Sequence, residues 1–432
     1  MPSAAALLHL LTASRARKRE QWLDPAEIRR HRVGRLRRLA AAAGRSPYWS
    51  AVLDRAGVRA DQLDDGPTFE RLPILERETL QAEAGAMRTV PAHGLFVMHS
   101  SGTTGRRLDV FRNEREQAEV SAIHARIHSA YGRRLRDRQL SIGSGFAAAP
   151  KGPIAMLRRT GLLPPILRLS SFDPVDARIE AMRRFRPDIV SGYAVAIEEL
   201  AEAMVERGVR DVHPHLVYTG SMRASERCRR LAQEAFGVRP LDIYATMETG
   251  PLAWECPESP GDYHLNDDVQ LLEIVGPDGR RLPDGESGEV VITPLTCLSH
   301  PLFRYRLGDQ AARRPDPCRC GRGLALMGQV DGRTAQTIRS PTGRQLNVAI
   351  ASSCFSPQPD IRRWQLQQVA PDRLRVLLMV APGWTERRRQ EVTEIVRKKT
   401  AGEFAVELME VDDIPLAPNG KFLMIVPLPS AG

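Results

Sequence analysis

The chain has 432 residues, of which 42% are hydrophobic and 26% charged, a composition typical of globular proteins with two or three domains. Its net charge of +10 arises from 62 basic and 52 acidic residues; five of the basic residues are lysines, and the arginines are scattered among acids, which argues against a nucleic-acid partner. The apolar runs, such as residues 374–381, are too short for a membrane span, and the N-terminus lacks the charged start of a signal peptide, so we expect a cytoplasmic protein.

The first 20 residues are interpreted as an amphipathic helix, and residues 16–60 as helical, with Gly57 closing a helix over 46–57. A loop rich in Ser, Thr and Gly follows His99, and we expect it to join a strand to a segment with helical spacing. Beyond it, short apolar runs alternate with amphipathic stretches. This alternation predicts strands over 139–146, 188–193, 215–221 and 241–246, and helices over 176–185, 196–208 and 225–237.

Strand–helix alternation predicts a largely parallel sheet, which binds ligands at the carboxyl ends of its strands. From residue 268 the pattern changes to strands joined by Asp-Gly turns, which predicts an antiparallel hairpin. The final segment predicts two strands, one helix and a last strand behind a linker. The expected fold class is therefore α/β. A large N-terminal domain (1–332) has mixed, largely parallel sheets and a hairpin-rich part, and a small, hinged α+β domain (333–432) follows.

The loop at residues 100–107 reads SSGTTGRR. Glycines leave its backbone N–H groups uncovered, the hydroxyl groups add donors, and Arg106 and Arg107 add positive charge. These are the properties of a site for a small anion, with phosphate as the first candidate. The alternative is a flexible surface loop.

Three further stretches follow this loop in order: IYATMETG at 243–250, YRLGD at 305–309 and NGK at 419–421. With these spacings, the chain resembles the adenylate-forming superfamily of acyl-CoA synthetases and non-ribosomal peptide synthetase adenylation domains. ERLPILERETL at 70–80, WECPES at 254–259 and CRCGR at 318–322 are similar to landmarks of its phenylacetate-CoA ligase group.

The resemblance implies an enzyme that uses ATP and Mg²⁺ to convert a carboxylic acid to acyl-AMP and then transfers the acyl group to coenzyme A. It places Tyr244 beside adenine, Asp309 on the ribose hydroxyls and Glu248 on Mg²⁺. It implies these ATP-binding residues: Ser100, Ser101, Gly102, Thr103, Thr104, Gly105, Gly220, Ser221, Tyr244, Ala245, Thr246, Asp309 and Arg333, the last at the hinge. The implied catalytic residues are Arg106, which stands where the family usually has lysine, Glu248 and Lys421.

Phe146, Tyr193 and Gly220 occur at predicted strand ends, and their apolar or small side chains favour a flat, uncharged ring in the acid. Met247 occupies a position where the family has Thr or Ser, and Thr246 is expected to replace it in part. Ala335 occupies the position of an acidic hinge residue. This departure leaves open an acceptor other than coenzyme A: an amine, another nucleophile or the phosphopantetheine of a carrier protein. A homodimer is also allowed. Retention of Glu248, Asp309 and Lys421 argues against a degenerate, non-enzymatic nucleotide-binding protein.

Three cysteines and one histidine form a candidate metal site. Cys318 and Cys320 lie in a turn-rich segment, and Cys256 precedes His264 in another. One imidazole and three thiolates suit tetrahedral zinc and leave no open position, which predicts a structural Zn²⁺ site, and the resemblance supports it. The alternative is three free thiols and a surface histidine. The other cysteines (228, 297 and 354) are interpreted as packing residues.

Overall fold

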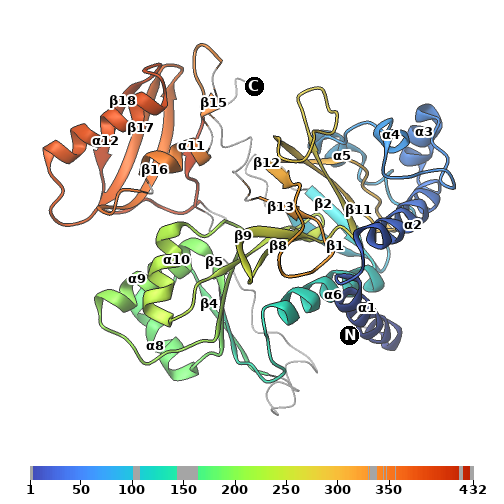
Figure 1. Cartoon of the computed structure of the whole chain (residues 1–432), viewed down its shortest axis with the longest axis horizontal. Helices are drawn as coiled ribbons and strands as arrows, with labels where there is room; N and C mark the ends of the chain where they lie inside the picture. The colour runs from blue at the N-terminus through green and yellow to red at the C-terminus, as the bar shows by residue number, and fades with distance from the viewer. Residues whose placement is uncertain are drawn as a thin grey trace.

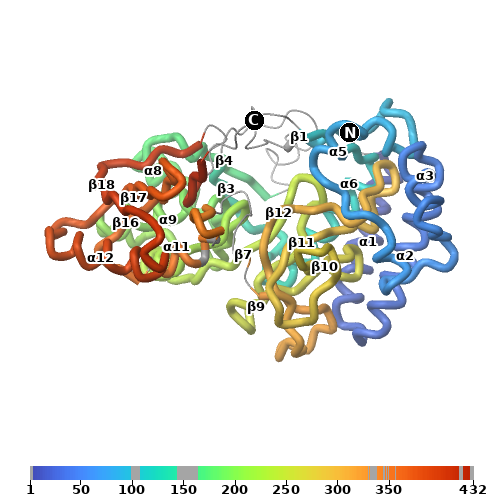
Figure 2. Tube along the Cα trace, turned by 90° about the horizontal axis from the view of Figure 1, so that it is seen from above, coloured from blue at the N-terminus to red at the C-terminus, as the bar shows by residue number. Residues whose placement is uncertain are grey.

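The computed structural model describes residues 3–98 with their side chains, the backbone of 99–100, and residues 108–143, 164–328, 330, 338–343, 345–346, 348–355, 357–417 and 422–428. A central sheet has the N-terminal helices, in blue, at one side, and a small unit in orange and red at the other (Figure 1). The view from above places these two regions at opposite ends of the molecule (Figure 2). No helix among the described residues is long and apolar enough to cross a membrane.

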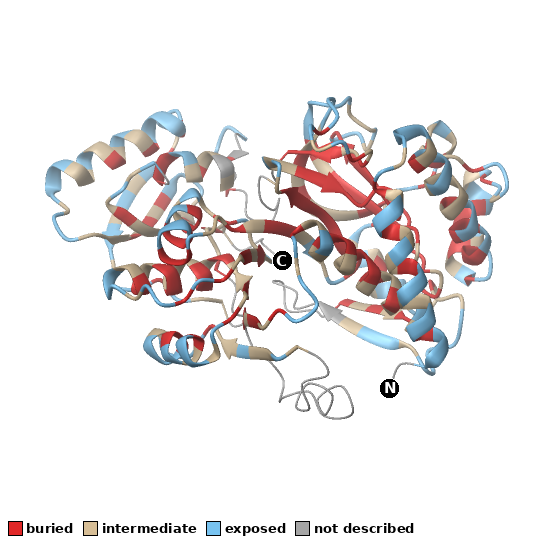
Figure 3. Cartoon of the chain, turned by 60° about the horizontal axis from the view of Figure 1, so that its bottom comes forward, coloured by how far each residue is buried: buried red, intermediate tan, exposed pale blue. Residues whose placement is uncertain are grey.

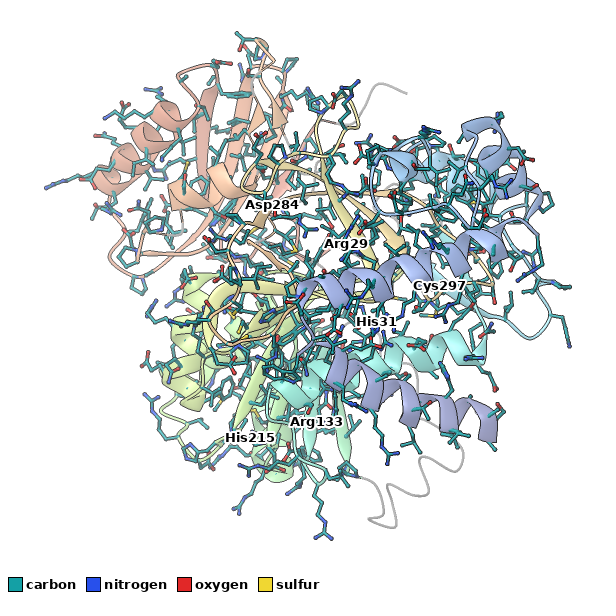
Figure 4. All side chains as sticks on the ribbon, turned by 45° about the vertical axis from the view of Figure 1, so that its right-hand side comes forward. Arg29, His31, Arg133, His215, Asp284 and Cys297 are labelled. Carbon is teal, nitrogen blue, oxygen red and sulfur yellow. The ribbon has the colours of Figure 1, made fainter. Side chains whose placement is uncertain are left out.

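The N-terminal region is helical, as predicted. Its helices are α1 (Ala4–Glu20), α2 (Pro25–Ala43), α3 (Pro47–Ala56), α4 (Pro67–Glu70) and α5 (Arg77–Glu83). Gly57 closes α3 with a left-handed φ of 61°, a conformation that costs glycine little. Arg29 and His31 mark α2 in Figure 4, and the Arg29 Nε donates to Asp65 at 2.9 Å, which holds α2 to the segment before α4.

A hairpin precedes the next helix. Strands β1 (Phe96–Ser100) and β2 (Leu108–Arg112) pair antiparallel, so the Ser/Thr/Gly-rich loop connects two strands of a hairpin, and β2 leads to α6 (Glu114–Ala130). Strand β2 was not predicted from the sequence. Helix α6 begins at an Asn113 capping box and packs along α1. The buried Asp268 carboxylate joins these helices, because it accepts from Arg17 at 3.1 Å and from Arg126 at 2.9 Å.

One sheet of eleven strands forms the centre of the molecule, in the order β10-β11-β12-β13-β9-β8-β7-β6-β5-β3-β4. Its parallel half contains β3 (Gln139–Gly143), β4 (Ile166–Ser170), β5 (Ile189–Tyr193), β6 (Leu216–Gly220) and β7 (Leu241–Thr246). Its antiparallel half contains β8 (Gly250–Cys256), β9 (Ser259–Leu265), β10 (Gln270–Val275), β11 (Ser287–Pro294), β12 (Tyr305–Arg314) and β13 (Leu326–Met327). The mixed α/β fold is confirmed, and the predicted parallel and hairpin-rich parts are the two halves of this sheet.

Helices cover both faces of the parallel half. Val190 and Val217 pack against α8 (Val175–Phe185), α9 (Ala194–Glu206) and α10 (Glu226–Phe236), whereas their neighbours Ile189 and Leu216 pack against α6. Consecutive strand residues point to opposite faces, so a strand buried on both faces is apolar throughout. Buried strand residues lie between partly exposed helices in Figure 3. The three predicted helices are confirmed as α8, α9 and α10.

The C-terminal unit has its own four-stranded sheet, in the order β18-β17-β16-β19. Its elements are β14 (Ile338–Arg339), β15 (Gln345–Leu346), α11 (Val348–Phe355), β16 (Ile361–Ala370), β17 (Arg373–Val380), α12 (Glu386–Lys399), β18 (Ala405–Glu410) and β19 (Ile425–Val426). A separate hydrophobic core contains Trp364, Val376 and Val392. The small α+β unit is confirmed, and α11 and β19 add to the predicted elements. The boundary at 332–333 lies outside the described residues, so the domain limits and the hinge stay predictions.

Candidate active site

Three parallel strands end side by side. Tyr193 at the end of β5 pairs in register with Gly220 at the end of β6, and Gly220 pairs with Ile243 in β7. Ser221 follows with a φ of 68°, a left-handed conformation that is uncommon for residues with a side chain and often occurs at functional sites. The predicted adenine- and acid-binding residues Gly220, Ser221 and Tyr193 therefore lie at one edge of the sheet.

Tyr244 and Asp309 meet across the sheet. The Tyr244 hydroxyl donates to the Asp309 Oδ2 atom at 2.5 Å, and Asp309 is buried. The register of β12 against β11 is interrupted between residues 306 and 310, and Gly308 within this bulge has a φ of 73°. Because glycine accepts this φ without strain, the bulge can present Asp309 toward Tyr244. The structure thus brings together two of the residues predicted to bind the nucleotide.

Glu248 lies in the short turn between β7 and β8. The Thr246 hydroxyl accepts from the Thr249 amide at 3.2 Å, and the Arg112 guanidinium donates to the carbonyl oxygens of Met247 and Glu248 at 3.1 and 2.9 Å. Glu248 is buried, and its carboxylate lies 3.6 Å from the Arg77 guanidinium. Arg112 is the last residue of β2 and pairs with Phe96, so this bond places the open end of the hairpin, opposite the Ser/Thr/Gly-rich loop, beside the Glu248 turn.

Several predicted site residues fall outside the described part of the chain. They are Ser101, Gly102, Thr103, Thr104, Gly105, Arg106, Phe146, Arg333 and Lys421, together with the side chain of Ser100. Ala245 and Thr246 are described and form the end of β7.

A pocket of about 320 Å³ lies between the parallel half of the sheet and the C-terminal unit. Its apolar lining from the large part of the molecule is Phe172, Tyr193, Val195, Ala196 and Met222, and from the C-terminal unit Ile414, Pro415, Leu416 and Phe422. Ser171, Glu199, Arg363 and Asp413 complete the wall. Of these residues, only Tyr193 was predicted from the sequence to bind the acid, because segments far apart in the sequence form the pocket.

The predicted Cys/His quartet is assembled in the structure. The ligand atoms of Cys256, His264, Cys318 and Cys320 lie within 4.8 Å of one another. The Cys318 and Cys256 Sγ atoms are 3.6 Å apart, and the Cys320 Sγ lies 3.2 Å from the His264 Nε2. Burial, with the charge of Arg322, lowers the pKa of His264 to about 4, which keeps the imidazole in the neutral form that binds metals.

The thiol groups respond differently to this environment. Burial raises the pKa of Cys256 and of Cys318. Burial also acts on Cys320, but hydrogen bonds from Arg322 outweigh it and hold its pKa below the ordinary value for a thiol. Three sulfurs and one imidazole within this distance fit a tetrahedral metal ion. Cys228, Cys297 (labelled in Figure 4) and Cys354 are buried elsewhere in the structure, as expected for packing residues.

A buried polar network under the site was not found from the sequence. Asp242 accepts hydrogen bonds from the Thr219 hydroxyl, from the Ala224 amide at 3.2 Å and from the Tyr263 hydroxyl at 2.9 Å. The Arg229 guanidinium donates to it at 2.7 Å. Burial raises the pKa of Asp242, and the charge of Arg229 opposes this effect. A charged residue inside the apolar strand LDIYAT was the available signal, because such a residue needs buried partners.

The chain is similar in sequence to known ligases. No protein-family model matches the chain. It is 29% identical to a phenylacetate-coenzyme A ligase of Thermus thermophilus over 334 residues, 73% of this chain and 72% of the relative. It is 28% identical to a phenylacetate-coenzyme A ligase of Pseudomonas putida over 72% of this chain and 73% of the relative. A more distant relative is a fumarate–(S)-2,3-diaminopropanoate ligase of Enterobacter agglomerans, which is 22% identical over 60% of this chain and 64% of its own length.

The fold is similar to a solved structure of 2-hydroxyisobutyryl-CoA ligase in complex with an acyl-AMP, with a TM-score of 0.79 and 18% identity over 94% of this chain and 91% of that one. The chain therefore has the mixed α/β fold of this acyl-CoA ligase. In sequence, the chain is similar to phenylacetate-coenzyme A ligases.

Proposed function

We propose that the chain is an AMP-forming carboxylate–CoA ligase. It activates a carboxylic acid with ATP to acyl-AMP, releases pyrophosphate and transfers the acyl group to coenzyme A. The observation that carries the proposal is the contact between Tyr244 and Asp309, because it joins an aromatic ring and a buried carboxylate beside the carboxyl ends of the parallel strands. The names of the relatives, phenylacetate-coenzyme A ligases that match about three quarters of the chain, support the same activity.

In the first step, a carboxylate oxygen of the acid forms a bond to the α-phosphorus of ATP as the bond to pyrophosphate breaks. The transition state concentrates negative charge, so it requires cations and N–H donors rather than a protein nucleophile. Tyr244 would lie against adenine, and Asp309 would accept hydrogen bonds from both ribose hydroxyls. Glu248 would bind Mg²⁺, which neutralises phosphate charge. Arg106 and the Ser/Thr/Gly-rich loop would hold the phosphate groups.

The pocket beside Tyr193 supports an acid with an apolar, aromatic body. Phe172, Tyr193 and Met222 offer apolar surface from the large part, and Phe422 offers it from the C-terminal unit. Lys421 immediately precedes Phe422 in the chain. We therefore assign Lys421 to the acid carboxylate and the α-phosphate. The C-terminal unit, from residue 333, would bring this lysine to the site and withdraw it for the second step.

In the second step, the sulfur of coenzyme A attacks the acyl carbonyl carbon and AMP leaves. The test of both steps is ATP–pyrophosphate exchange with a panel of carboxylic acids, followed by mass analysis of the product after coenzyme A is added. We expect aryl acids to support exchange and the thioester to form only with coenzyme A. Absence of exchange with every acid, under conditions in which a phenylacetate-CoA ligase is active, would contradict the proposal.

For the Cys/His quartet we propose a structural Zn²⁺ site. Cys256 ends β8, His264 lies in β9, and Cys318 and Cys320 lie in the segment between β12 and β13. All four positions of a tetrahedral ion would be occupied by protein atoms, which leaves none for a substrate. The ion would therefore hold these segments together and take no part in the chemistry.

A second candidate keeps the adenylation step and changes the acceptor to an amine or to a carrier protein's phosphopantetheine. Two points favour it: Ala335 stands where the resemblance places an acidic hinge residue, and a distant relative is named as a ligase of fumarate and (S)-2,3-diaminopropanoate. Acyl-AMP that accumulates with coenzyme A but is consumed when an amine or a loaded carrier protein is added would select this candidate.

A further inference from the structure

The loop after β6 is held from below by one buried carboxylate. Asp242 accepts from the side chain of Thr219 and from the amide of Ala224, so it spans the segment that contains Gly220 and Ser221. Ser221 has a left-handed φ of 68°, which residues with side chains adopt only where the surrounding structure holds them. The shape of this loop at the proposed nucleotide and acid site therefore depends on the position of Asp242.

Asp242 is in turn positioned by β8, β9 and α10. The Tyr263 hydroxyl of β9 donates to it at 2.9 Å, and the Arg229 guanidinium of α10 donates at 2.7 Å. Arg229 also donates to Glu255 of β8 at 3.0 Å, and the same carboxylate accepts from the Asp242 amide at 3.1 Å. Asp242, Glu255, Tyr263 and Arg229 are all buried; Glu255 also accepts from Arg239 and from the Gly261 amide, and Arg229 also donates to the Pro240 carbonyl.

The β8 and β9 residues of this network are next to two members of the Cys/His quartet. Glu255 precedes Cys256, and Tyr263 precedes His264. Glu255 and Tyr263 are directly opposite each other in the β8–β9 ladder, and the register shifts between Glu255 and Cys256. Adjacent strand residues point to opposite faces. Cys256 and His264 therefore belong to the quartet, whereas their neighbours Glu255 and Tyr263 belong to the network.

We propose that the Cys/His quartet, when it binds its metal ion, positions the substrate loop at residues 219–224 through Tyr263, Glu255 and Arg229. This inference rests on the proposed function for the role of the loop. Tyr263 is a positioning residue: it acts through Asp242 on the loop. Loss of the ion would let the ends of β8 and β9 shift, and the hydrogen bonds to Asp242 would weaken.

Hydrogen exchange in peptides that cover residues 216–225 tests the proposal without any need for activity. Two variants are compared with the wild type. Tyr263→Phe removes one donor to Asp242, and the double variant Cys318→Ser/Cys320→Ser removes two members of the quartet. The zinc content of each protein is measured. Loss of one hydrogen bond to a charged group should increase the rate of hydrogen exchange of the loop amides by roughly tenfold. Ser259→Ala is the matched control, since it removes a hydrogen bond to Asp262 in the same hairpin but outside the network.

We expect faster loop exchange in Tyr263→Phe with zinc retained, and faster loop exchange in wild-type protein after chelation, reversed when Zn²⁺ alone is added. Tyr263→Phe should also raise KM for ATP or the acid more than it lowers kcat. Chelation works on the intact sequence, so the test remains valid if the double cysteine variant does not fold. Unchanged loop exchange after complete zinc removal would overturn the coupling. Absence of acyl-AMP formation, with loop exchange behaving as expected, would overturn the proposed function and leave the coupling in place.

Discussion

The Tyr244 hydroxyl donates to the Asp309 carboxylate at 2.5 Å although three strands separate β7 from β12 in the sheet. Neighbouring strands are about 4.8 Å apart, so a flat sheet would keep these two strands far beyond the reach of a side chain. The antiparallel half of the sheet must therefore curl toward the parallel half. This curvature brings together the aromatic ring and the carboxylate to which we assign the nucleotide.

The Tyr244→Phe substitution should raise KM for ATP several-fold in pyrophosphate exchange, because Asp309 loses the donor that orients it. Asp309→Ala should lower kcat/KM for ATP by at least about tenfold, because the ribose hydroxyls lose their acceptor. Tyr48→Phe, on α3 and away from the site, is the matched control and should leave both constants unchanged. A wild-type KM for ATP in Asp309→Ala would remove Asp309 from the nucleotide site.

Purified protein should contain about one zinc per chain by elemental analysis, the content of a single structural site. Cys318→Ser should lower the zinc content and the melting temperature together, because the ion holds β8 and β9 to the segment before β13. Cys354→Ser replaces a buried cysteine of the C-terminal unit and should leave the zinc content unchanged. Full zinc content in a protein that lacks both Cys318 and Cys320 would show that the quartet is not the metal site.

Stability should fall on acidification because of His300. Burial, with the charge of Arg88, lowers the pKa of His300 to about 4 from an ordinary value of 6.5. Between these pH values His300 stays neutral in the folded protein but binds a proton in the unfolded chain. The contribution of His300 to the free energy of unfolding therefore falls as the pH is lowered from 6.5 to 4. The slope is about 1.4 kcal/mol per pH unit for one proton.

The measurement is urea unfolding of wild type and His300→Gln at several pH values between 7 and 4.5. The free-energy advantage of the wild type should shrink as the pH falls, and the exposed His93→Gln control should show no such trend. A constant difference between wild type and His300→Gln would mean that His300 is protonated equally in both states.

The periodicity of apolar residues was enough to predict the strands and helices of the parallel half of the sheet. The alternation of apolar runs and amphipathic stretches identified β5, β6 and β7 with the helices between them, and hence the edge where Tyr193 and Gly220 meet. The Cys/His quartet was predicted from residue type, because few side chains can bind a soft metal and four of them occurred in two turn-rich segments.

Contacts between distant segments were beyond this reasoning. Arg112 binds the Glu248 turn across 136 positions of sequence, and no local pattern indicates its partner. The ion pairs among Arg229, Asp242 and Glu255 require the correct placement of two strands and a helix, β7, β8 and α10. The Tyr244–Asp309 contact needs the curvature of the sheet. These hydrogen bonds and ion pairs depend on how the strands are arranged in the sheet. A charged residue within an apolar strand indicates that it has a buried partner, but does not identify that partner.

Lys421 is one of five lysines among 62 basic residues, so a lysine at this position in an arginine-rich chain indicates a geometric requirement. A compact ammonium group on a thin stem can reach both the acid carboxylate and the α-phosphate in a closed cleft, where the planar guanidinium of arginine is bulkier. Pro418, Asn419 and Gly420 precede it and favour a tight turn that presents the side chain.

The Lys421→Ala substitution should reduce pyrophosphate exchange by roughly 10²-fold or more, the effect of losing one positioned charge from a transition state. Lys421→Arg should recover little of this rate if the requirement is geometric. The same variants should convert chemically supplied acyl-AMP and coenzyme A to the thioester at a near-normal rate, because the lysine serves only the first step. Lys399→Ala, on the exposed face of α12, is the control and should retain wild-type exchange. A wild-type rate of pyrophosphate exchange in Lys421→Ala would place the lysine outside the site. It would also contradict the proposal that the C-terminal unit moves to bring this lysine to the substrates.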